Sequence, residues 1–307
     1  MVLRGRADGT LRRRCVLPMN FAAAMLIALL LDAALGWPAA IRRRIGHPGD
    51  WVTALFRGWG PVSGWAVLAA FLGIAVLTWG IGRALPSGWP GVLVMALIAW
   101  PFVAVRAAHE EATRVANALG TGDLADAKAI LTGHNLDAEQ VADAPSLART
   151  ALQDVADRAT ERGVAPLFWG ALLGLPGIAV YTVIHRVARL EDVGRGLVRV
   201  EALVTLIPAR MTGGLIALAA TNVRRTAFRT MLRDARRSGA RNEDWARAAM
   251  AGALGVRLSG GGTEEDAEIW LNPVADAPRT QDVARGLVLY QRAIAFFGLL
   301  LLFAALT

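Results

Sequence analysis

The residues most suited to chemistry lie on one acidic stretch, where Asp154, Asp157 and Glu161 follow one another at intervals of three and four residues. On an α-helix this spacing places the three carboxylates along one stripe. Magnesium prefers a few carboxylates together with phosphate oxygens, so the stripe suits a metal–nucleotide complex. The same spacing also lets Asp154 pair with Arg158 at i+4 on a solvated helix face, which is a purely structural arrangement.

A second stretch, 224–237, is rich in arginine, and Arg225, Arg229 and Arg233 repeat every four residues. A row of guanidinium groups suits bidentate recognition of phosphate. It equally suits a basic amphipathic helix that lies on an anionic membrane leaflet. The spacing alone leaves both alternatives open.

Two isolated groups are also candidates. Asp32 lies near the end of the first apolar run, and an ionisable group at membrane depth suggests a function. The alternative for Asp32 is an interfacial residue that caps the next turn. His47 lies between Gly46 and Pro48, and a single histidine specifies neither a metal site nor a catalytic base.

The elements that must position these residues are apolar helices. Of the 307 residues, 55% are hydrophobic and 19% are charged, and the mean hydropathy is +0.42. This composition excludes a disordered chain and a disulfide-stapled domain. A spanning helix needs roughly 20 apolar residues, and the runs that approach this length are 16–36, 61–82, 89–105, 164–185, 200–222 and 287–306. We therefore expect an all-α, polytopic integral membrane protein with five or six spanning helices.

Two polar segments, which we expect to be helical, divide the chain into five parts. The parts are 1–105 (membrane helices with an arginine-rich tail), 106–163 (polar), 164–222 (membrane helices), 223–286 (polar) and 287–307 (a membrane helix). Within the polar segments, Asp123 and Ser146 are predicted to cap helices, with the second helix ending at Gly163. A further helix is predicted to begin at Asn242 and to end at Gly255.

The charge balance and the single cysteine narrow the class further. The formal net charge is +8, but membrane proteins often carry excess arginine in cytoplasmic loops, so we expect no nucleic-acid partner. Cys15 is the one cysteine, which excludes an internal disulfide and a cysteine-based zinc site.

Several ordered blocks resemble a known family. They are LLLDAALGWP (29–38), RIGHP (44–48), His109 with GDLADAK (122–128), VAPLFWGALLGLPG (164–177), IPAR (207–210), RDARR (233–237) and NEDWARAAMAGALGVRLSG (242–260). In order and spacing they resemble the adenosylcobinamide-phosphate synthase family of cobalamin biosynthesis, the CobD/CbiB family of integral membrane proteins. The resemblance covers almost the whole chain.

The resemblance implies an ATP-dependent amide-forming reaction at the cell inner membrane. In it, a carboxylate of adenosylcobyric acid is joined to (R)-1-aminopropan-2-ol or its phosphate, with ATP as co-substrate and Mg²⁺ as the metal. The implied partners are this corrinoid, the amine and the lipid bilayer. Asp157, Glu161 and Glu201 are the expected catalytic residues, and the first two are also the expected metal ligands. The expected substrate-binding residues are Asp32, His47, His109, Arg210, Arg233, Arg236, Asn242 and Trp245.

The chain also departs from the family pattern. The family's Lys, Asn and Asp are absent from the stretch 182–190, and the acidic run before Val164 keeps only part of its acids, as Asp157 and Glu161. These departures imply an alternative: a catalytically degenerate member that acts as a membrane scaffold or a regulatory subunit for an active paralogue or another corrin enzyme. For an active site, we expect stretches 153–161 and 225–237 to meet above the membrane and grip an anionic ligand.

Overall fold

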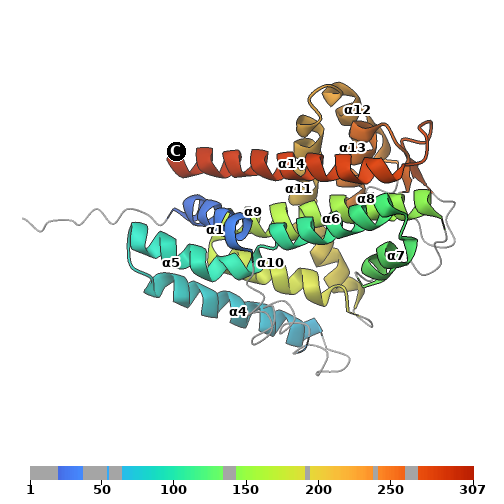
Figure 1. Cartoon of the computed structure of the whole chain (residues 1–307). Coiled ribbons are helices and arrows are strands. Elements are labelled where there is room, and N and C mark those ends of the chain that lie inside the picture. Colours follow the sequence, from blue (N-terminus) through green and yellow to red (C-terminus); the bar gives the residue numbers. More distant parts are fainter. Residues whose placement is uncertain are drawn as a thin grey trace, which may run out of the picture.

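The computed structural model describes residues 20–36, 54, 64–133, 143–190, 194–237, 241–259 and 269–307. They form a helical molecule with one small hairpin (Figure 1). In chain order the elements are α1 (Phe21–Leu35), α4 (Gly64–Ala84), α5 (Trp89–Ala99), the 3₁₀ turn η1 (Trp100–Phe102), α6 (Val105–Thr121), α7 (Leu124–Thr132), α8 (Ala144–Arg158), the π-helical segment η2 (Ala159–Val164), α9 (Ala165–Leu173), α10 (Leu175–Val187), α11 (Arg195–Ala219), α12 (Arg224–Asp234), α13 (Asn242–Leu254), β1 (Leu258–Ser259), β2 (Trp270–Leu271) and α14 (Thr280–Leu306).

Three helical stretches are long and apolar enough to cross a membrane. They are Trp89–Thr121, in which α5, η1 and α6 follow one another, together with α11 and α14. Phe21–Leu35 and Leu68–Ala84 are shorter apolar helices. The predicted run 164–185 is not one helix, because Gly174 turns the backbone with a φ of 68° between α9 and α10. The all-α class is confirmed, and the described residues contain three candidate spanning helices.

The outermost helices expose large apolar side chains. α4 and α14 lie on opposite sides of the molecule in Figure 1. Val76 and Leu77 of α4 and Leu299 and Phe303 of α14 are all more than half exposed. Contiguous apolar surface of this kind is rare on soluble proteins and marks contact with lipid or with another protein. The surface therefore agrees with the membrane class that the composition predicts.

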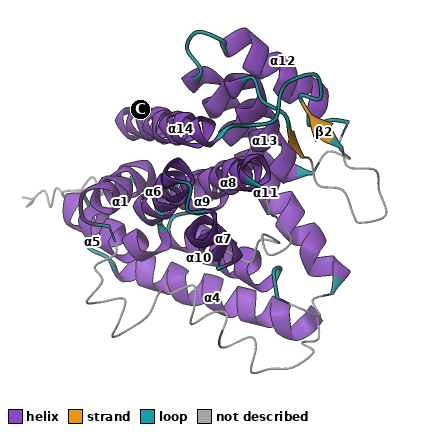
Figure 2. Cartoon of the chain, turned by 45° about the vertical axis from the view of Figure 1, so that its right-hand side comes forward, coloured by secondary structure: helices purple, strands orange, loops and turns teal. Residues whose placement is uncertain are grey.

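Glycines allow α13 to pack closely against its neighbours. A Cβ on Gly213 of α11 would lie 2.7 Å from the carbonyl oxygen of Trp245, and one on Gly252 would lie 2.7 Å from Cβ of Thr230 on α12. Small residues at such crossings let helix backbones approach each other. As a result α13 packs against α8, α11 and α12 (Figure 2).

The helix ends agree in part with the predictions. Asp123 caps α7 and Gly255 ends α13 in the left-handed conformation, as predicted. Ser146 does not cap the next helix, because the Asp143 carboxylate accepts the N–H of Ser146 and α8 begins earlier, at Ala144. Nor does that helix end at Gly163, since the chain continues through η2 directly into α9. The two-residue strands β1 and β2 were not predicted, because they are too short to show an alternating pattern.

Candidate functional site

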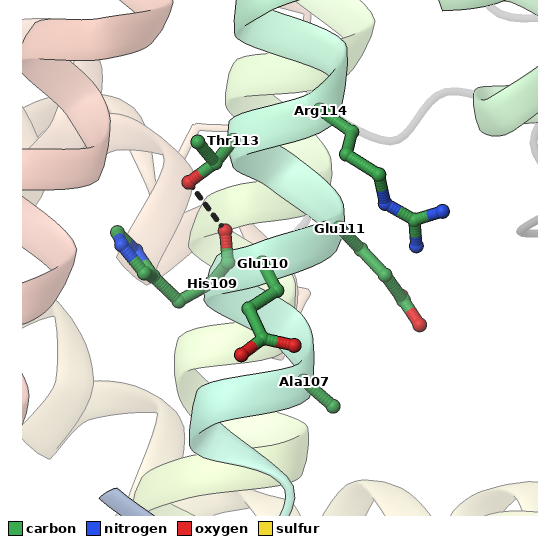
Figure 3. A pocket seen from close by; sticks show the side chains of 6 residues that line it. All are labelled: Ala107, His109, Glu110, Glu111, Thr113 and Arg114. Carbon is green, nitrogen blue, oxygen red and sulfur yellow. Dashed lines mark hydrogen bonds between the residues drawn. The ribbon is translucent and has the colours of Figure 1, made fainter. Parts of the chain in front are cut away.

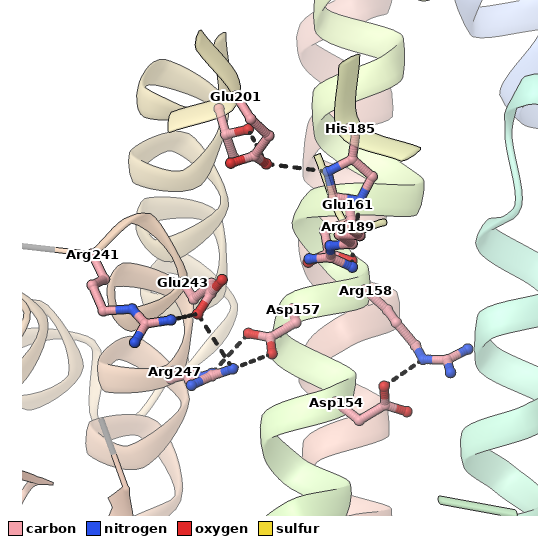
Figure 4. A network of polar contacts seen from close by, with 11 residues as sticks. Asp154, Asp157, Arg158, Glu161, His185, Arg189, Glu201, Arg241, Glu243 and Arg247 are labelled. Atoms are coloured by element: carbon pink, nitrogen blue, oxygen red, sulfur yellow. Dashed lines mark hydrogen bonds and ion pairs between the residues drawn. The ribbon is translucent and has the colours of Figure 1, made fainter. Parts of the chain in front are cut away.

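A network of charged side chains lies where α8, η2, α10, α11 and α13 come together (Figure 4). It contains all three carboxylates predicted for catalysis, Asp157, Glu161 and Glu201, whose side chains are 13%, 11% and 22% exposed. Removing an ionised carboxylate from water costs several kcal/mol unless a partner compensates the charge. The partners therefore decide what these groups can do.

Asp157 is held by an arginine from another helix. Its carboxylate accepts hydrogen bonds from Nε of Arg247 at 2.9 Å and from Nη2 at 2.5 Å, and Arg247 also lies 3.7 Å from Glu243. Burial raises the pKa of Asp157 to about 7, and Arg247 opposes the shift only in part. Burial acts to lower the pKa of Arg247, but Asp157 and Glu243 outweigh it, so this pKa is higher than usual. Asp157 is thus suited to exchange a proton near neutral pH.

Glu161 has two basic partners. Both of its oxygens accept hydrogen bonds from Arg189, one of them at 2.8 Å, and Nε2 of His185 lies 3.5 Å away. Burial acts to raise the pKa of Glu161, but Arg189 and His185 outweigh it and hold the pKa well below its usual range. Two nearby carboxyls whose pKa values are pushed apart can divide acid and base roles between them. Here Glu161 is the group that stays ionised.

Glu201 completes this part of the network from α11. It accepts hydrogen bonds from Nδ1 of His185 at 3.2 Å and from the Thr205 hydroxyl at 2.9 Å. Both ring nitrogens of His185 therefore face carboxylates. A neutral imidazole donates from only one nitrogen, so the protonated ring is the form that satisfies both. Tyr181 stacks on His185 with ring centroids 5.6 Å apart, and its buried hydroxyl has no hydrogen bond within the described residues.

A second set of ion pairs points from α8 towards α6. Arg158 binds Asp154 at 2.6 Å and also binds Glu111 of α6, which lies 3.4 Å from Arg162. Burial lowers the pKa of Arg162, and the nearby Arg158 guanidinium lowers it further. The i+4 pairing of Asp154 with Arg158 is thus confirmed. Asp154 faces away from Asp157 and belongs to the structural contact between α8 and α6 (Figure 4).

The donor set does not fit a metal ion in this arrangement. Among the described residues, no group of three or more His, Cys, Asp or Glu side chains could hold one. Asp157 and Glu161, the predicted metal ligands, each give both oxygens to a guanidinium. Magnesium requires carboxylate oxygens that are free to coordinate it, so these ion pairs would have to open first. We assign no chemical step to a metal held by these two residues.

Three of the predicted substrate-binding residues form a cluster on α11 and α13. The Arg210 guanidinium lies 3.2 Å from Oδ1 of Asn242 and 4.6 Å from the ring centroid of Trp245. Asn242 in turn donates to the carbonyl oxygen of Ala202 at 2.6 Å. The cluster joins α11 to the start of α13, one turn of α13 before Arg247. It therefore positions α13 relative to the acidic network.

The arginine row of α12 does not reach the acidic stripe. α13 lies between α8 and α12, and Arg233 pairs with its neighbour Asp234 at 2.6 Å. Arg236 is exposed in the turn after α12. The expectation that 153–161 and 225–237 meet is therefore wrong. The arginines that bind Asp157 and Glu161 are instead Arg247 of α13 and Arg189, which follows the end of α10.

The remaining predicted residues lie elsewhere. Asp32 is buried and accepts the backbone N–H of Arg106 at 2.9 Å, so it caps α6 from α1. His109 lines a hollow of about 520 Å³ along α6 with Ala107, Glu110, Glu111, Thr113 and Arg114 (Figure 3). Its Nε2 lies 3.0 Å from the Gln291 amide. His47 lies outside the described residues.

Sequence reasoning missed the basic half of the network. Arg247 carried one weak signal, its i+4 spacing from Glu243. His185 and Arg189 occupy the stretch 182–190 in which the family's own motif is absent, and nothing in their spacing indicates Glu161 as a partner. Long-range pairs of this kind depend on helix packing, which a single sequence does not reveal.

Comparison with known proteins matches most of the chain to one family. Residues 25–290 match the model of the family described as CobD/Cbib protein. The chain is 44% identical to the cobalamin biosynthesis protein CobD of Rhodobacter capsulatus, over 90% of this chain and 95% of that protein. It is 34% identical to the protein of that name from Geobacter metallireducens, over 78% of this chain and 81% of the relative. No solved structure matches the chain significantly. The chain therefore belongs to the CobD/Cbib family.

Proposed function

We propose that this chain works in cobalamin biosynthesis and forms the amide between adenosylcobyric acid and (R)-1-aminopropan-2-ol or its phosphate, giving adenosylcobinamide or its phosphate. The observation that carries the proposal is the 44% identity to a cobalamin biosynthesis protein across 95% of that relative's length. The family resemblance supplies ATP as the co-substrate that activates the carboxylate, with Mg²⁺ carried on the ATP phosphates. The net reaction joins a carboxylate and an ammonium group to an amide while ATP becomes ADP and inorganic phosphate, which takes up the departing carboxylate oxygen, and a proton is released.

The network supports distinct roles for its residues. An attacking amine must lose a proton, and a base is most effective when its pKa lies near the working pH. Asp157, with its pKa raised to about 7, is the group suited to accept that proton once its ion pair with Arg247 opens. Glu161 stays ionised and fixes His185 and Arg189 in place. The Arg189 side chain is 52% exposed, so its guanidinium is accessible to an anionic group of a substrate.

The setting of the reaction is the membrane. We place the protein in the cell inner membrane as a multi-pass protein with five or six spans. In this arrangement α1 and α4, together with the α9–α10 pair, supplement the three longer helices. The charged network then lies beside the lipid-facing helices, where a corrinoid and a small amine can meet with little water.

The test is turnover by the purified chain. Protein incubated with adenosylcobyric acid, aminopropanol or its phosphate, ATP and Mg²⁺ is expected to yield the amide, detected by mass spectrometry. Asp157→Asn is expected to lower kcat by at least about a hundredfold, the range of a lost general base. Asp154→Asn is the matched control on the same helix, because Asp154 pairs towards α6. No amide from the folded protein would sink the proposal.

One observation favours a second candidate, a catalytically degenerate scaffold or regulatory subunit. Each predicted catalytic carboxylate already bonds to a basic side chain of the same chain, as a purely structural network would. A scaffold would bind adenosylcobyric acid or an active paralogue without any turnover. Binding without product, followed by product when an active relative is added, distinguishes this candidate from the synthase.

A further inference from the structure

The helix α12 carries the strongest unbalanced charge in the described part of the chain. Residues 224–237 include six arginines and one acid, Asp234. Arg233 uses its guanidinium on Asp234. The other five form what we call the basic face: Arg224, Arg225, Arg229, Arg236 and Arg237, all exposed and without an ion pair to any described residue.

The opposite face of α12 is fully used in packing. Ala227, Thr230, Met231 and Asp234 are buried, and they recur at the spacing of one helix stripe. Thr230 and Ala227 lie against Gly252 of α13. The orientation of α12 is therefore fixed by the fold, and the arginines are held outward rather than free to turn inward.

The place of α12 in the chain puts it near a membrane surface. α11, a candidate spanning helix, ends at Ala219, and only residues 220–223 separate it from Arg224. Four residues reach at most about 14 Å. Leu218, Val223 and Leu232 are each about two-fifths exposed beside the arginines. Arginines interspersed with exposed apolar side chains, next to the end of a span, are typical of a helix at the lipid headgroups.

We propose that the basic face of α12 binds the anionic phospholipid headgroups of the bilayer in which α11 and α14 are embedded. The headgroup phosphates supply the negative charge that this face lacks within the described chain. Leu232 and Val223 reach the acyl boundary. The contact is independent of the proposed reaction, because α13 separates α12 from the acidic network.

The test compares two bilayers around the full-length protein. It is reconstituted in nanodiscs of phosphatidylcholine alone or of phosphatidylcholine with phosphatidylglycerol, and amide hydrogen exchange is measured across 224–237. Each arginine near an anionic surface contributes about fivefold, so exchange is expected to slow by at least that factor with phosphatidylglycerol. High salt should remove the difference.

Substitutions on α12 test whether the charge of the basic face, rather than the fold of the helix, causes the protection. The triple glutamine variant of Arg224, Arg225 and Arg229 is expected to show no effect of phosphatidylglycerol on exchange. The triple lysine variant at the same positions keeps the charge and is expected to retain most of the effect. The matched control changes Arg195 and Arg199, exposed at the other end of α11, to glutamine and should leave exchange at 224–237 unaltered. Equal exchange in the two bilayers overturns the proposal. So does protection of 224–237 by inorganic phosphate or by an oligonucleotide without any effect of phosphatidylglycerol.

Discussion

At the scale of residues, the buried carboxylates of the network are not independent of one another, because two of them, Glu161 and Glu201, contact the same basic side chain, His185. Glu161 bonds to the half-exposed Arg189 and lies 3.5 Å from the buried His185. His185 in turn reaches Glu201. If Arg189 leaves to meet a ligand, His185 still compensates the charge on Glu161. The arrangement therefore tolerates movement of one base without leaving a buried carboxylate uncompensated.

This sharing predicts coupled effects of mutation. Arg189→Gln and His185→Gln together are expected to lower the free energy of unfolding by about 0.5–3 kcal/mol more than the sum of the single changes. Unfolding is measured in detergent for the four proteins of the cycle. Arg233→Gln, which removes a similarly exposed arginine from a buried carboxylate, is the control and should add to Arg189→Gln without coupling. Simple additivity for the first pair would contradict shared compensation.

The pKa of Asp157 predicts a specific dependence of stability on pH. Folding raises this pKa from 3.8 to about 7, so between these values the folded chain holds a proton that the unfolded chain has released. The contribution of Asp157 to stability is therefore fully present below about pH 4 and is lost as the pH rises through 7. Asp157→Asn cannot titrate and should lack this decline. Melting curves of both proteins from pH 4 to 8 check the prediction, and parallel curves would refute it.

At the scale of elements, α13 decides the geometry of the site. It brings Arg247 to Asp157, carries the Asn242–Trp245 contact with Arg210, and separates the arginines of α12 from the acids of α8. Its place depends on Gly213 and Gly252, where a side chain would collide with the neighbouring helix.

Gly213→Ala is expected to lower the free energy of unfolding by about 1–3 kcal/mol, because the added methyl group overpacks the α11–α13 contact. It should also lower turnover, since α13 carries Arg247. Gly214→Ala is the control: nothing lies within 4 Å of its Cβ position, so helix propensity alone should stabilise the protein slightly. Equal effects of the two changes would show that the close contact is not formed.

The element boundaries show where local sequence signals are sufficient. Asp123 and Gly255 mark helix ends correctly, because caps depend on neighbouring backbone groups. Asp32 caps α6 across 74 positions of sequence, so a local pattern could not reveal it. The π-helical segment η2 replaces the helix end predicted at Gly163, and the chain continues through it directly into α9.

At the scale of the whole molecule, the exposed apolar belt and the charged network occupy different parts of one bundle. The belt includes the outer surfaces of α4 and α14, and the network lies among α8, α10, α11 and α13. An arginine placed in this apolar belt should therefore oppose insertion of its helix into the bilayer.

Leu299→Arg, on the apolar half of α14, is expected to reduce the amount of protein in the membrane fraction, at a cost of about 2.5–3.5 kcal/mol for an arginine deep in the bilayer. Val274→Arg is the control, because Val274 is 91% exposed in the segment before α14. Quantitative immunoblots of washed membranes compare the two with the unaltered chain. Unchanged membrane amounts for Leu299→Arg would place this part of α14 outside the bilayer.

The sequence by itself determined the helical membrane class and the family, because apolar run length and ordered motifs are local properties of the chain. It predicted a shared site for the acids Asp157, Glu161 and Glu201, whose catalytic role stays a prediction. Only the tertiary structure decided which bases meet those acids. Arg247 comes from α13, whereas His185 and Arg189 come from α10 and the turn directly after it, so their approach to the acids depends on how these helices pack. The packing of α12 against α13 likewise leaves the arginines of α12 exposed to solvent. Charge partners separated by many residues are set by helix crossings, and those crossings depend on close contacts that no local pattern encodes.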